Sequence, residues 1–487
     1  MKYLFFTITI LVFASSVSAD RLVRLYDVSQ SSVMDMIEEG YDVASVDMRN
    51  GYVDIMLPER DVDQAALLSY DYEVLPREWG ELLPENLDNG GYYYSPAENL
   101  AFWCTLSNNY SDLVDTPVTI GQSYEDRDIY MIRLTSPTSG YKPPIYFSSL
   151  IHAREPGGNS VLIGFAMWLT SNYDGGDTRA AWILDNTTVY FVPVANPDGY
   201  TYNMPGGGMH RKNMNFTLGD GVDLNRNWGY KWGYDDSGSS PYPNYPTYRG
   251  TSAFSEPETQ VQRDFIIDIQ PIAAMNYHSY GKWLIYPYGY KENTYTPDQS
   301  TFVAWSAVMT AQNGYFAGTA PECLYAVNGE QNDWMYGGNG EQGIMAFTPE
   351  VGTSFWGGQN DSSVIVNNCA DCRPMNIFIC MNAPGFVGIN GDESFEIEPL
   401  LSLNSVYPNP ALSSASFRIT SSGFSDVNVM IYDTSGRIVD SFETVNPEGG
   451  TVSMIWVVPG EIPAGVYTVR ISDAAGNCDS RRFTVIR

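Results

Sequence analysis

Residues 144–170 read PIYFSSLIHAREPGGNSVLIGFAMWLT and carry the clearest structural signal in the chain. The run Pro144–Ala153 is apolar and predicts a buried strand. Pro156-Gly157-Gly158 then forms a turn, and Asn159–Thr170 has the apolar face of a helix. A buried strand that leads through a turn into a helix is the repeating unit of an α/β sheet.

The same alternation continues along the chain. Further buried strands are expected at Thr187–Val194, Pro271–Tyr277 and Ile344–Thr348. Ser255 and Glu258 have the spacing of a capping box and predict a helix that ends near Ile269. We therefore expect residues 96–388 to form an α/β domain with a mixed, largely parallel central sheet flanked by helices.

A smaller unit is predicted at residues 20–80. Its expected strands are Arg21–Val28, Tyr41–Asp47, Tyr52–Leu57 and Tyr72–Leu75, and its expected helices are Ser31–Glu39 and Arg60–Ser69. Ser31 is the predicted helix cap, and Asn50-Gly51 favours a tight hairpin. The order βαββαβ predicts a ferredoxin-like fold. Residues 81–95 are acidic and rich in glycine, and indicate a linker.

Residues 395–487 contain short strand patterns with turn residues between them and no helical pattern. The expected strands are Phe417–Thr420, Val427–Tyr432, Thr451–Val458, Val466–Ser472 and Arg482–Ile486. This pattern of short strands and turns predicts a small antiparallel β-sandwich.

The first 19 residues have the features of a secretory signal peptide: Lys2, an apolar run and the small residues Val17-Ser18-Ala19. A membrane anchor is the weaker interpretation, because the run is shorter than the roughly 20 residues that a span needs. We therefore expect export. Cys369 and Cys372 form a CxxC motif in a helical context, which favours a disulfide or buried thiols over a zinc ribbon.

The charge balance excludes some partners. The 487 residues include 26 Lys+Arg and 57 Asp+Glu, which gives a formal net charge of −31. Nucleic acids and anionic lipid surfaces attract basic faces, so neither is an expected partner. The hydrophobic share of 44% is large enough for a sizeable core.

Two polar residues, His152 and Glu155, lie where the first strand ends, and strand carboxyl ends are where open α/β sheets bind ligands. The chain has three histidines. His278 follows another predicted strand, whereas His210 lies in a Gly-rich loop, a poor place for a rigid ligand. A catalytic zinc site keeps three protein ligands and one open position. We predict that His152, Glu155 and His278 bind one Zn²⁺.

Six motifs occur in a set order: HAREPGG, HRKN, GVDLNRNW, NYHSYGKWLIYPYG, LYAVNGEQNDW and FTPEVG. Together they resemble the zinc metallocarboxypeptidases of the carboxypeptidase A/B/T family over about residues 95–385. The resemblance implies a carboxypeptidase-like catalytic domain that hydrolyses the C-terminal peptide bond of peptides or proteins with one zinc ion.

The resemblance also implies two catalytic residues. Glu350 would be the general base that takes a proton from the attacking water, and Arg211 would polarise the scissile carbonyl and hold the oxyanion. One departure concerns Pro349, which stands where the family commonly has an aromatic residue. Because proline removes a backbone donor, strand pairing next to Glu350 is expected to differ.

Substrate-binding residues follow from the same motifs. Asn225 and Arg226 would hold the terminal carboxylate of the substrate, and Tyr325 would close over it. Asp223 would orient the first histidine ligand, and Arg154 would line the outer substrate cleft.

The side-chain pocket is expected at Asn332 and Glu330, which precede Asp333. A polar residue beside an acidic one resembles the bacterial family members that accept both apolar and basic C-terminal residues. We therefore expect broad specificity that includes Lys and Arg.

Both flanking units have family resemblances. Residues 20–80 resemble the activation pro-segments of these enzymes, with a permanent accessory domain as the alternative. YPNP at 407–410, YDTSGR at 432–437 and PAGVY at 463–467 resemble the C-terminal sorting domain of the type IX (Por) secretion system. An adhesion sandwich is the alternative. The resemblance implies contact with the secretion machinery and a secreted or cell-surface location, reached through the periplasm.

Three functions remain open on the sequence. The leading one is a secreted zinc exopeptidase acting on peptide C-termini. The second is a cell-wall peptidase that cuts stem peptides on the same fold, and the third is an inactive peptide-binding module. The Asn225-Arg226 pair favours the first, because it needs a free terminal carboxylate.

Overall fold

A computed structural model describes residues 20–486 apart from 59–60, 63–69, 76–92, 174, 176, 205–207, 218, 339–342, 359–360, 388–400, 422–426, 435–436, 446–450, 461 and 474–477. The predicted signal segment 1–19, almost all of the predicted helix Arg60–Ser69 and most of the linker 81–95 lie outside the described residues. The chain divides into two compact units. The first comprises residues 1–297 and 318–369, and the second comprises residues 298–317 and 370–487.

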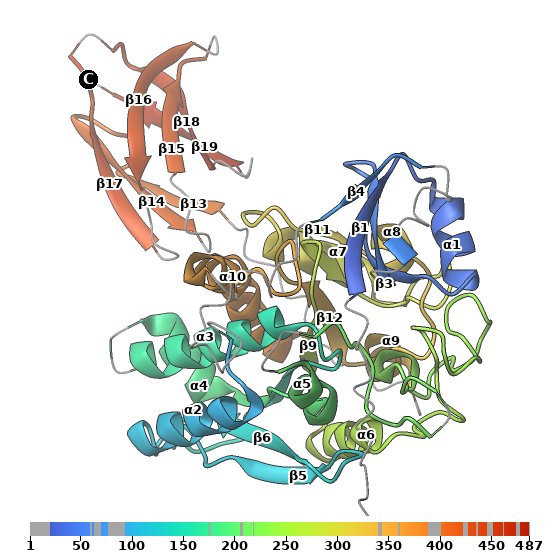
Figure 1. Cartoon of the computed structure of the whole chain (residues 1–487). Helices are drawn as coiled ribbons and strands as arrows, with labels where there is room; N and C mark the ends of the chain where they lie inside the picture. Colours follow the sequence, from blue (N-terminus) through green and yellow to red (C-terminus); the bar gives the residue numbers. More distant parts are fainter. Residues whose placement is uncertain are drawn as a thin grey trace, which may run out of the picture. The chain divides into compact units, whose positions relative to one another are not determined.

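The centre of the first unit is a mixed sheet with the strand order β11-β10-β12-β9-β7-β8-β6-β5 (Figure 1). Its strands are β5 Val118–Gln122, β6 Asp128–Leu134, β7 Pro144–Ser149, β8 Thr188–Val192, β9 Ala273–Tyr277, β10 Trp283–Ile285, β11 Phe316–Gly318 and β12 Met345–Glu350. The pairs β12-β9, β9-β7 and β7-β8 are parallel. The pairs β10-β12, β8-β6 and β6-β5 are antiparallel. The predicted mixed sheet is confirmed, with its parallel pairs at the centre.

Helices cover both faces of this sheet. They are α2 Pro96–Asn109, α3 Pro156–Tyr173, α4 Thr178–Asn186, α5 Pro197–Asn203, α6 Pro257–Ile269, α8 Ala320–Cys323 and α9 Gln331–Gly337. Neighbouring side chains on β7 point to opposite faces: Tyr146 packs on Phe265 of α6, and Phe147 packs on Phe165 of α3. Both aromatic side chains of β7 are fully buried. A strand buried on both sides explains the unbroken apolar run in its sequence.

The turn between β7 and α3 is tighter than predicted. The helix begins at Pro156 rather than Asn159, because proline is well suited to the first helical position. Gly158 lies against β9, and a Cβ added at Gly158 would stand 2.7 Å from Cβ of Tyr277. This close approach requires glycine and fixes the start of α3 beside the end of β9.

The predicted capping box of α6 is wrong. Glu256, not Ser255, is the N-cap residue, and its side chain makes no capping bond. Glu258 instead accepts a hydrogen bond from the backbone N–H of Tyr124, at 3.0 Å. A hydrogen bond to a residue distant in sequence thus replaces the expected capping bond within residues 255–258. The spacing of Ser255 and Glu258 alone does not reveal this partner.

An N-terminal sheet also belongs to the first unit, with the order β2-β3-β1-β4. It consists of β1 Asp20–Tyr26, α1 Gln30–Glu38, β2 Asp42–Asp47, β3 Tyr52–Pro58 and β4 Tyr72–Val74. The hairpin forms at Asn50-Gly51 as expected, with Gly51 at φ +73°. Ser29 caps α1 by accepting from the N–H of Ser32, so the predicted cap at Ser31 is wrong.

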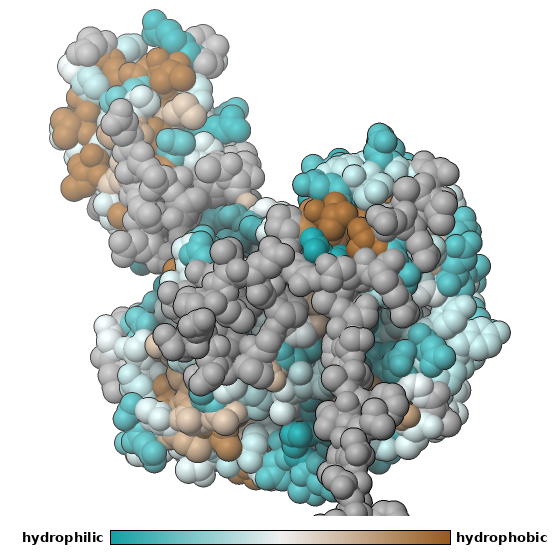
Figure 2. Space-filling view, viewed as in Figure 1, coloured by the Kyte–Doolittle hydropathy of each residue, from teal (hydrophilic) through white to brown (hydrophobic). Residues whose placement is uncertain are grey.

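The second unit contains α7 Gln299–Met309, the continuation of α10 Ser362–Val387, and a β-sandwich. The strands are β13 Leu401–Tyr407, β14 Ser414–Ser421, β15 Val427–Tyr432, β16 Ile438–Val445, β17 Thr451–Val457, β18 Gly465–Asp473 and β19 Cys478–Val485. They form the antiparallel sheets β13-β14-β17 and β16-β15-β18-β19. The sandwich is as predicted, although β13 and β16 were not expected. Hydrophobic side chains gather on its surface, where Ile455 and Val457 are exposed (Figure 2).

Cys369 and Cys372 lie in α10, as their helical context predicted. Cys323 and Cys380 are buried thiols. Among the described residues, no helix combines the length and the hydropathy that a membrane crossing requires.

Candidate active site

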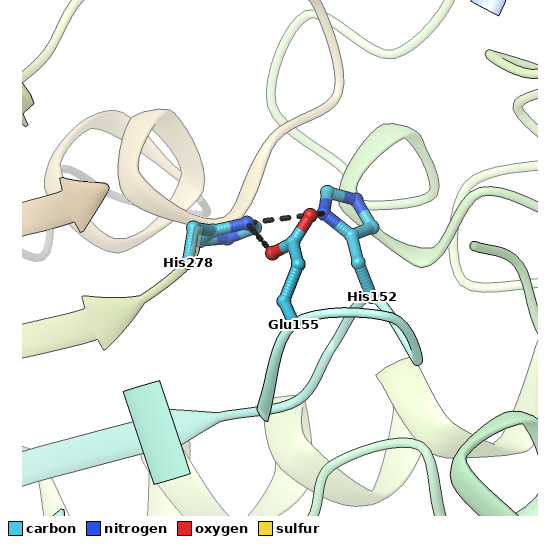
Figure 3. Close-up of side chains that lie close together, drawn as sticks. All are labelled: His152, Glu155 and His278. Atoms are coloured by element: carbon cyan, nitrogen blue, oxygen red, sulfur yellow. Dashed lines mark hydrogen bonds and ion pairs between the residues drawn. The ribbon is translucent and has the colours of Figure 1, made fainter. Parts of the chain in front are cut away.

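His152, Glu155 and His278 converge on one point (Figure 3). Their ligand atoms all lie within 4.8 Å of one another. Nδ1 of His152 lies 3.0 Å from Glu155 Oε1, and Nδ1 of His278 lies 3.0 Å from Glu155 Oε2. The two Nδ1 atoms are themselves 3.0 Å apart. Two imidazole nitrogens and one carboxylate around an open position form the donor set of a catalytic zinc site, so these residues fit the metal.

The folding of three segments produces this convergence. His152 and Glu155 lie on the turn between β7 and α3, which the approach of Gly158 to β9 holds in place. His278 follows β9, where its N–H donates to Pro349 and its carbonyl accepts from Val351. The central parallel strands therefore deliver all three side chains to the same edge, as the carboxyl ends of neighbouring strands do.

Asp223 supports the metal ligands from behind. Its Oδ1 lies 3.1 Å from Nε2 of His152, and its Oδ2 lies 3.0 Å from a terminal nitrogen of Arg211. Burial alone would raise the pKa of Asp223, but Arg211, Arg226 and His152 hold that pKa well below its usual value. A charged carboxylate on Nε2 leaves Nδ1 as the metal-binding nitrogen.

Electrostatics also keep the remaining ligands in their binding forms. Burial lowers the pKa of His278, so its imidazole is neutral. Burial alone would raise the pKa of Glu155, yet the imidazoles of His152 and His278 lower it. A neutral imidazole and an ionised carboxylate are the forms that a zinc ion binds.

Glu350 ends β12 and forms a parallel bridge with His278. Burial and the charge of Glu155 raise the pKa of Glu350 well above its usual value. Pro349 does not interrupt the strand, because its carbonyl accepts from His278 and β10 still pairs with β12.

Two basic residues and a tyrosine lie in the same cavity. Arg211 stands 3.6 Å from Glu155 Oε1. Arg226, on the short helix Leu224–Arg226, lies 3.5 Å from the hydroxyl of Tyr325. The side-chain oxygen of Asn225 accepts from the N–H of Gln331, which leaves its NH₂ group for a ligand. These groups and the metal cluster line one cavity with an empty volume of about 540 Å³.

The N-terminal sheet contributes to this cavity, on the side where a pro-segment was expected to cover it. Val43, Ala44 and Ser45 of β2 are among its lining residues. Asp42, at the start of β2, binds Arg154 through both of its carboxylate oxygens. Arg154 is 1% exposed and lies over the ring of Phe355, so its guanidinium is held by the N-terminal sheet.

The two residues of the predicted side-chain pocket differ in their surroundings. Asn332 uses both ends of its amide: its oxygen accepts from Asn276 at 2.7 Å, and its nitrogen donates to Thr348 at 2.8 Å. Glu330 lines the cavity, and its Oε1 has no hydrogen-bond partner among the described residues.

His210 lies apart from the metal cluster, as expected. Its Nε2 is 3.1 Å from the carbonyl of Asn213, and its ring packs on Tyr202 and Phe216. Two contributors to the site were missed, Asp42 and Thr348. Asp42 belongs to no motif, and Thr348 lies in the motif FTPEVG, in which only Glu350 was singled out.

Comparison with known proteins gives the family. Residues 100–361, more than half of the chain, match the family model for zinc carboxypeptidase, and residues 405–485 match that for a secretion system C-terminal sorting domain. Human carboxypeptidase A1 is 33% identical over 307 residues, which are 58% of this chain and 71% of that protein. A metallocarboxypeptidase A-like protein of Trichophyton verrucosum (strain HKI 0517) is 31% identical, over 53% of this chain and 62% of that protein.

Solved structures agree with the fold. Bovine thrombin-activatable fibrinolysis inhibitor, in complex with tick carboxypeptidase inhibitor, is 27% identical with a TM-score of 0.53, covering 60% of this chain and 98% of that chain. Carboxypeptidase A from Helicoverpa armigera has a TM-score of 0.62 at 22% identity, covering 75% and 97%. The extent of the family match and the convergence of its motif residues on one metal-binding cluster lead to one conclusion: the chain belongs to the zinc carboxypeptidase family.

Proposed function

We propose that this metallocarboxypeptidase removes single residues from the C-termini of peptides and proteins. The observation that carries the proposal is the shared cavity. It places the guanidinium of Arg226 and the amide of Asn225 beside the His152–Glu155–His278 cluster. A buried arginine matches the planar, bidentate geometry of a carboxylate, so a terminal carboxylate held there would bring the last peptide bond to the metal ligands.

Each protein group has one task in the proposed reaction. Zinc, when bound, lowers the pKa of water to about 7 and polarises the scissile carbonyl. Glu350 accepts the proton of the attacking water and passes it to the leaving amine. Arg211 donates to the oxygen on which negative charge develops, and Tyr325 closes over the bound carboxylate.

Peptide end groups test this function. The zinc-loaded chain is incubated with peptides that differ only in a free or an amidated C-terminus, and released amino acids are measured. We expect single-residue release from the free form, strong suppression by amidation, and loss of release after chelation. Equal cleavage of both forms would instead favour an amidase or an endopeptidase, and binding without any release would favour an inactive binding module.

We also propose that residues 20–80 act as a pro-segment. The proposal is supported by β2, whose residues line the cavity, and by the pair Asp42–Arg154, which holds the sheet at the site. A substrate that entered along Arg154 would have to displace Asp42. Cleavage in the predicted linker 81–95 would separate this sheet from the catalytic part.

Export is proposed from the C-terminal match. Residues 405–485 form most of the β-sandwich and match a secretion sorting domain, which supports a secreted or cell-surface enzyme. The test is the location of full-length protein and of a form lacking residues 395–487 in a host with the corresponding secretion system. Export of both forms would contradict the proposal.

A further inference from the structure

Asn213 lies two residues after Arg211 and is fully buried. Its backbone N–H donates to the carbonyl of Val222 at 3.1 Å, and its side-chain oxygen accepts from the N–H of Val222 at 2.9 Å. Val222 is followed directly by Asp223. One asparagine therefore fastens the segment that carries Arg211 to the segment that carries Asp223.

The side-chain NH₂ group of Asn213 extends this contact to the start of α6. It donates to Glu256 Oε2 at 2.8 Å and to Glu258 Oε2 at 3.2 Å. Glu256 is 2% exposed and Glu258 is fully buried, and Glu258 also accepts from the backbone N–H of Tyr124 between β5 and β6. The side-chain oxygen of Asn213 takes a second hydrogen bond from the N–H of Asn215, at 3.3 Å. Both donors and both acceptor positions of this amide are thus used within the fold.

Arg211 has its own contacts at both ends. Its carbonyl accepts from the N–H of Ala153, on the turn that carries two of the metal ligands, at 3.0 Å. Its Nε lies 3.1 Å from Asp223 Oδ2, and a terminal nitrogen lies 3.6 Å from Glu155 Oε1. A long side chain keeps one rotamer only when its partners outweigh the conformational entropy that it loses. The contact of Asn213 with Val222 favours this rotamer, because it fixes the backbone of Arg211 relative to that of Asp223.

We propose that Asn213 is a positioning residue for the reaction: it holds the guanidinium of Arg211 beside the metal ligands without itself contacting the substrate. The inference rests on the proposed function, in which Arg211 donates to the oxygen on which negative charge develops. Such a donor is effective when it is in place before the reaction, and a displacement of about 1 Å can cost about 100-fold in rate. Asn213 is not among the residues that line the cavity, so its effect must pass through Arg211.

Two neighbours of Asn213 have different tasks. Nζ of Lys212 donates to the carbonyls of Pro243 and Tyr245, at 3.0 and 2.7 Å, and so fixes another loop. Asn215 shares the acceptor Glu256 with Asn213, at 2.9 Å, but its side-chain oxygen accepts from Thr217 instead of the segment before Asp223. Asn215 is therefore the matched control, because its removal takes a hydrogen bond from the same carboxylate.

The test measures kcat and KM separately. The zinc-loaded full chain and its variants are treated with a Glu-specific protease until activity stops rising, and release of Phe from a short peptide is followed at neutral pH. For Asn213→Ala we expect kcat to fall by about 10- to 100-fold and KM to stay within about twofold, because the donor is needed in the transition state. Asn215→Ala should keep the native kcat. A rise in KM alone, or loss of the zinc, would indicate a general disturbance and overturn the inference.

A second variant keeps the test decisive if Asn213→Ala does not fold. Asn213→Asp retains the oxygen that accepts from Val222 but places a carboxylate against Glu256 and Glu258, so kcat should also fall. Combining it with Glu258→Gln restores a donor, since the glutamine oxygen can accept from Tyr124 while its NH₂ group donates to the new carboxylate. We expect this combination to recover about tenfold in kcat. No recovery would contradict the assigned hydrogen bonds.

A double-mutant cycle examines whether Asn213 acts through Arg211. Arg211→Ala alone should lower kcat by about 100- to 1,000-fold, the usual effect of losing an oxyanion donor. Adding Asn213→Ala, or Asn213→Asp, should lower kcat no further, since the group that is positioned has been removed. An additional fall as large as the one in the native background would overturn the inference.

Chemical labelling gives a readout independent of turnover. Phenylglyoxal reacts with accessible guanidinium groups, and mass spectrometry locates the product at Arg211. We expect several-fold faster labelling of Arg211 in Asn213→Asp than in the native chain or in Asn215→Ala, because Asp223 no longer holds the guanidinium. Unchanged labelling with an unchanged kcat overturns the inference, while release of Phe still supports the proposed function. If the native chain releases no residue, the proposed function fails, and labelling alone judges whether Asn213 positions Arg211.

Discussion

Asp223 contacts three residues on which the proposed chemistry depends. It accepts from His152 and Arg211, and it lies 3.8 Å from Arg226. One buried carboxylate therefore fixes the tautomer of a metal ligand and orients two cations in the cavity. Arg211, Arg226 and His152 together outweigh the effect of burial and hold its pKa well below the usual value, so the carboxylate stays ionised through the neutral pH range.

Glu350→Gln tests the proposed general base. Glutamine keeps the shape of the side chain but cannot accept the proton of the attacking water. We expect kcat to fall by about 10³-fold, within the range for losing a general acid–base residue. Zinc content, measured by atomic absorption, should remain one per chain, because Glu350 is not among the three ligands. A variant that loses zinc together with activity would contradict this assignment.

The metal ligands could be predicted because the chain has only three histidines, two of which follow buried strands. The ion pair of Arg154 with Asp42 could not, since an acidic residue on a strand edge has the same sequence appearance whether it faces solvent or a distant arginine. The hydrogen bonds of Asn332 on α9 were equally hidden, because its partners Asn276 and Thr348 lie on β9 and β12.

At the scale of elements, β2 is the segment that lies across the proposed substrate site. Its residues Val43, Ala44 and Ser45 line the cavity, and Asp42 binds Arg154. A second tie comes from β3, where Asp54 accepts from the hydroxyl of Tyr280 at 2.7 Å. A sheet held at two points would form a stable cover, and under the proposed function its removal would open the cavity to a substrate.

Asp42→Asn tests this cover. Asp42 is partly exposed, but its partner Arg154 is buried. Removing the charged partner of a buried arginine typically costs about 3 kcal/mol, so the uncleaved chain should gain about 10- to 100-fold in activity on a small peptide. Asp35→Asn, on the exposed face of α1, is the matched control and should change nothing. Equal activity of the Asp42→Asn chain and the unchanged chain, both uncleaved, would contradict the pro-segment proposal.

The same contact has a pH dependence of defined sign. Burial alone would raise the pKa of Asp42, but Arg154 lowers it below its usual value. A lowered folded-state pKa means that the ion pair stabilises the cover at and above pH values of about 4 and that this stabilisation is lost as the pH falls further. Brief exposure of the uncleaved chain to acid should therefore increase its susceptibility to proteolysis of the N-terminal sheet, whereas Asp42→Asn should show little such change.

Element boundaries followed the sequence where local chemistry dominates. The hairpin at Asn50-Gly51 formed as expected because its turn depends on adjacent residues. The caps were less predictable: α1 uses Ser29 where three serines stand close together, and Glu258 is drawn to the backbone of Tyr124. When several nearby acceptors could make the capping bond equally well, tertiary packing determines which of them does so.

At the scale of the whole molecule, the metal-binding residues and the β-sandwich belong to different compact units. Zinc should therefore stabilise only the first. A metal present at 1,000 times its Kd adds about 4 kcal/mol to the unit that binds it. In differential scanning calorimetry we expect chelation to lower one melting transition by several degrees and to leave the transition of the sandwich in place. A shift of both transitions would show that the units unfold together.

The contact of Gly158 with Tyr277 has a consequence for anyone who wishes to transplant this metal site. His152 and Glu155 are fixed to the start of α3, His278 is fixed to the end of β9, and a single missing methyl group sets the gap between those two segments. Copying the three ligands onto a new scaffold would reproduce their chemistry without their spacing. The graft must therefore include Gly158 and Tyr277, because their contact sets the distance between the ligands although neither residue is a ligand.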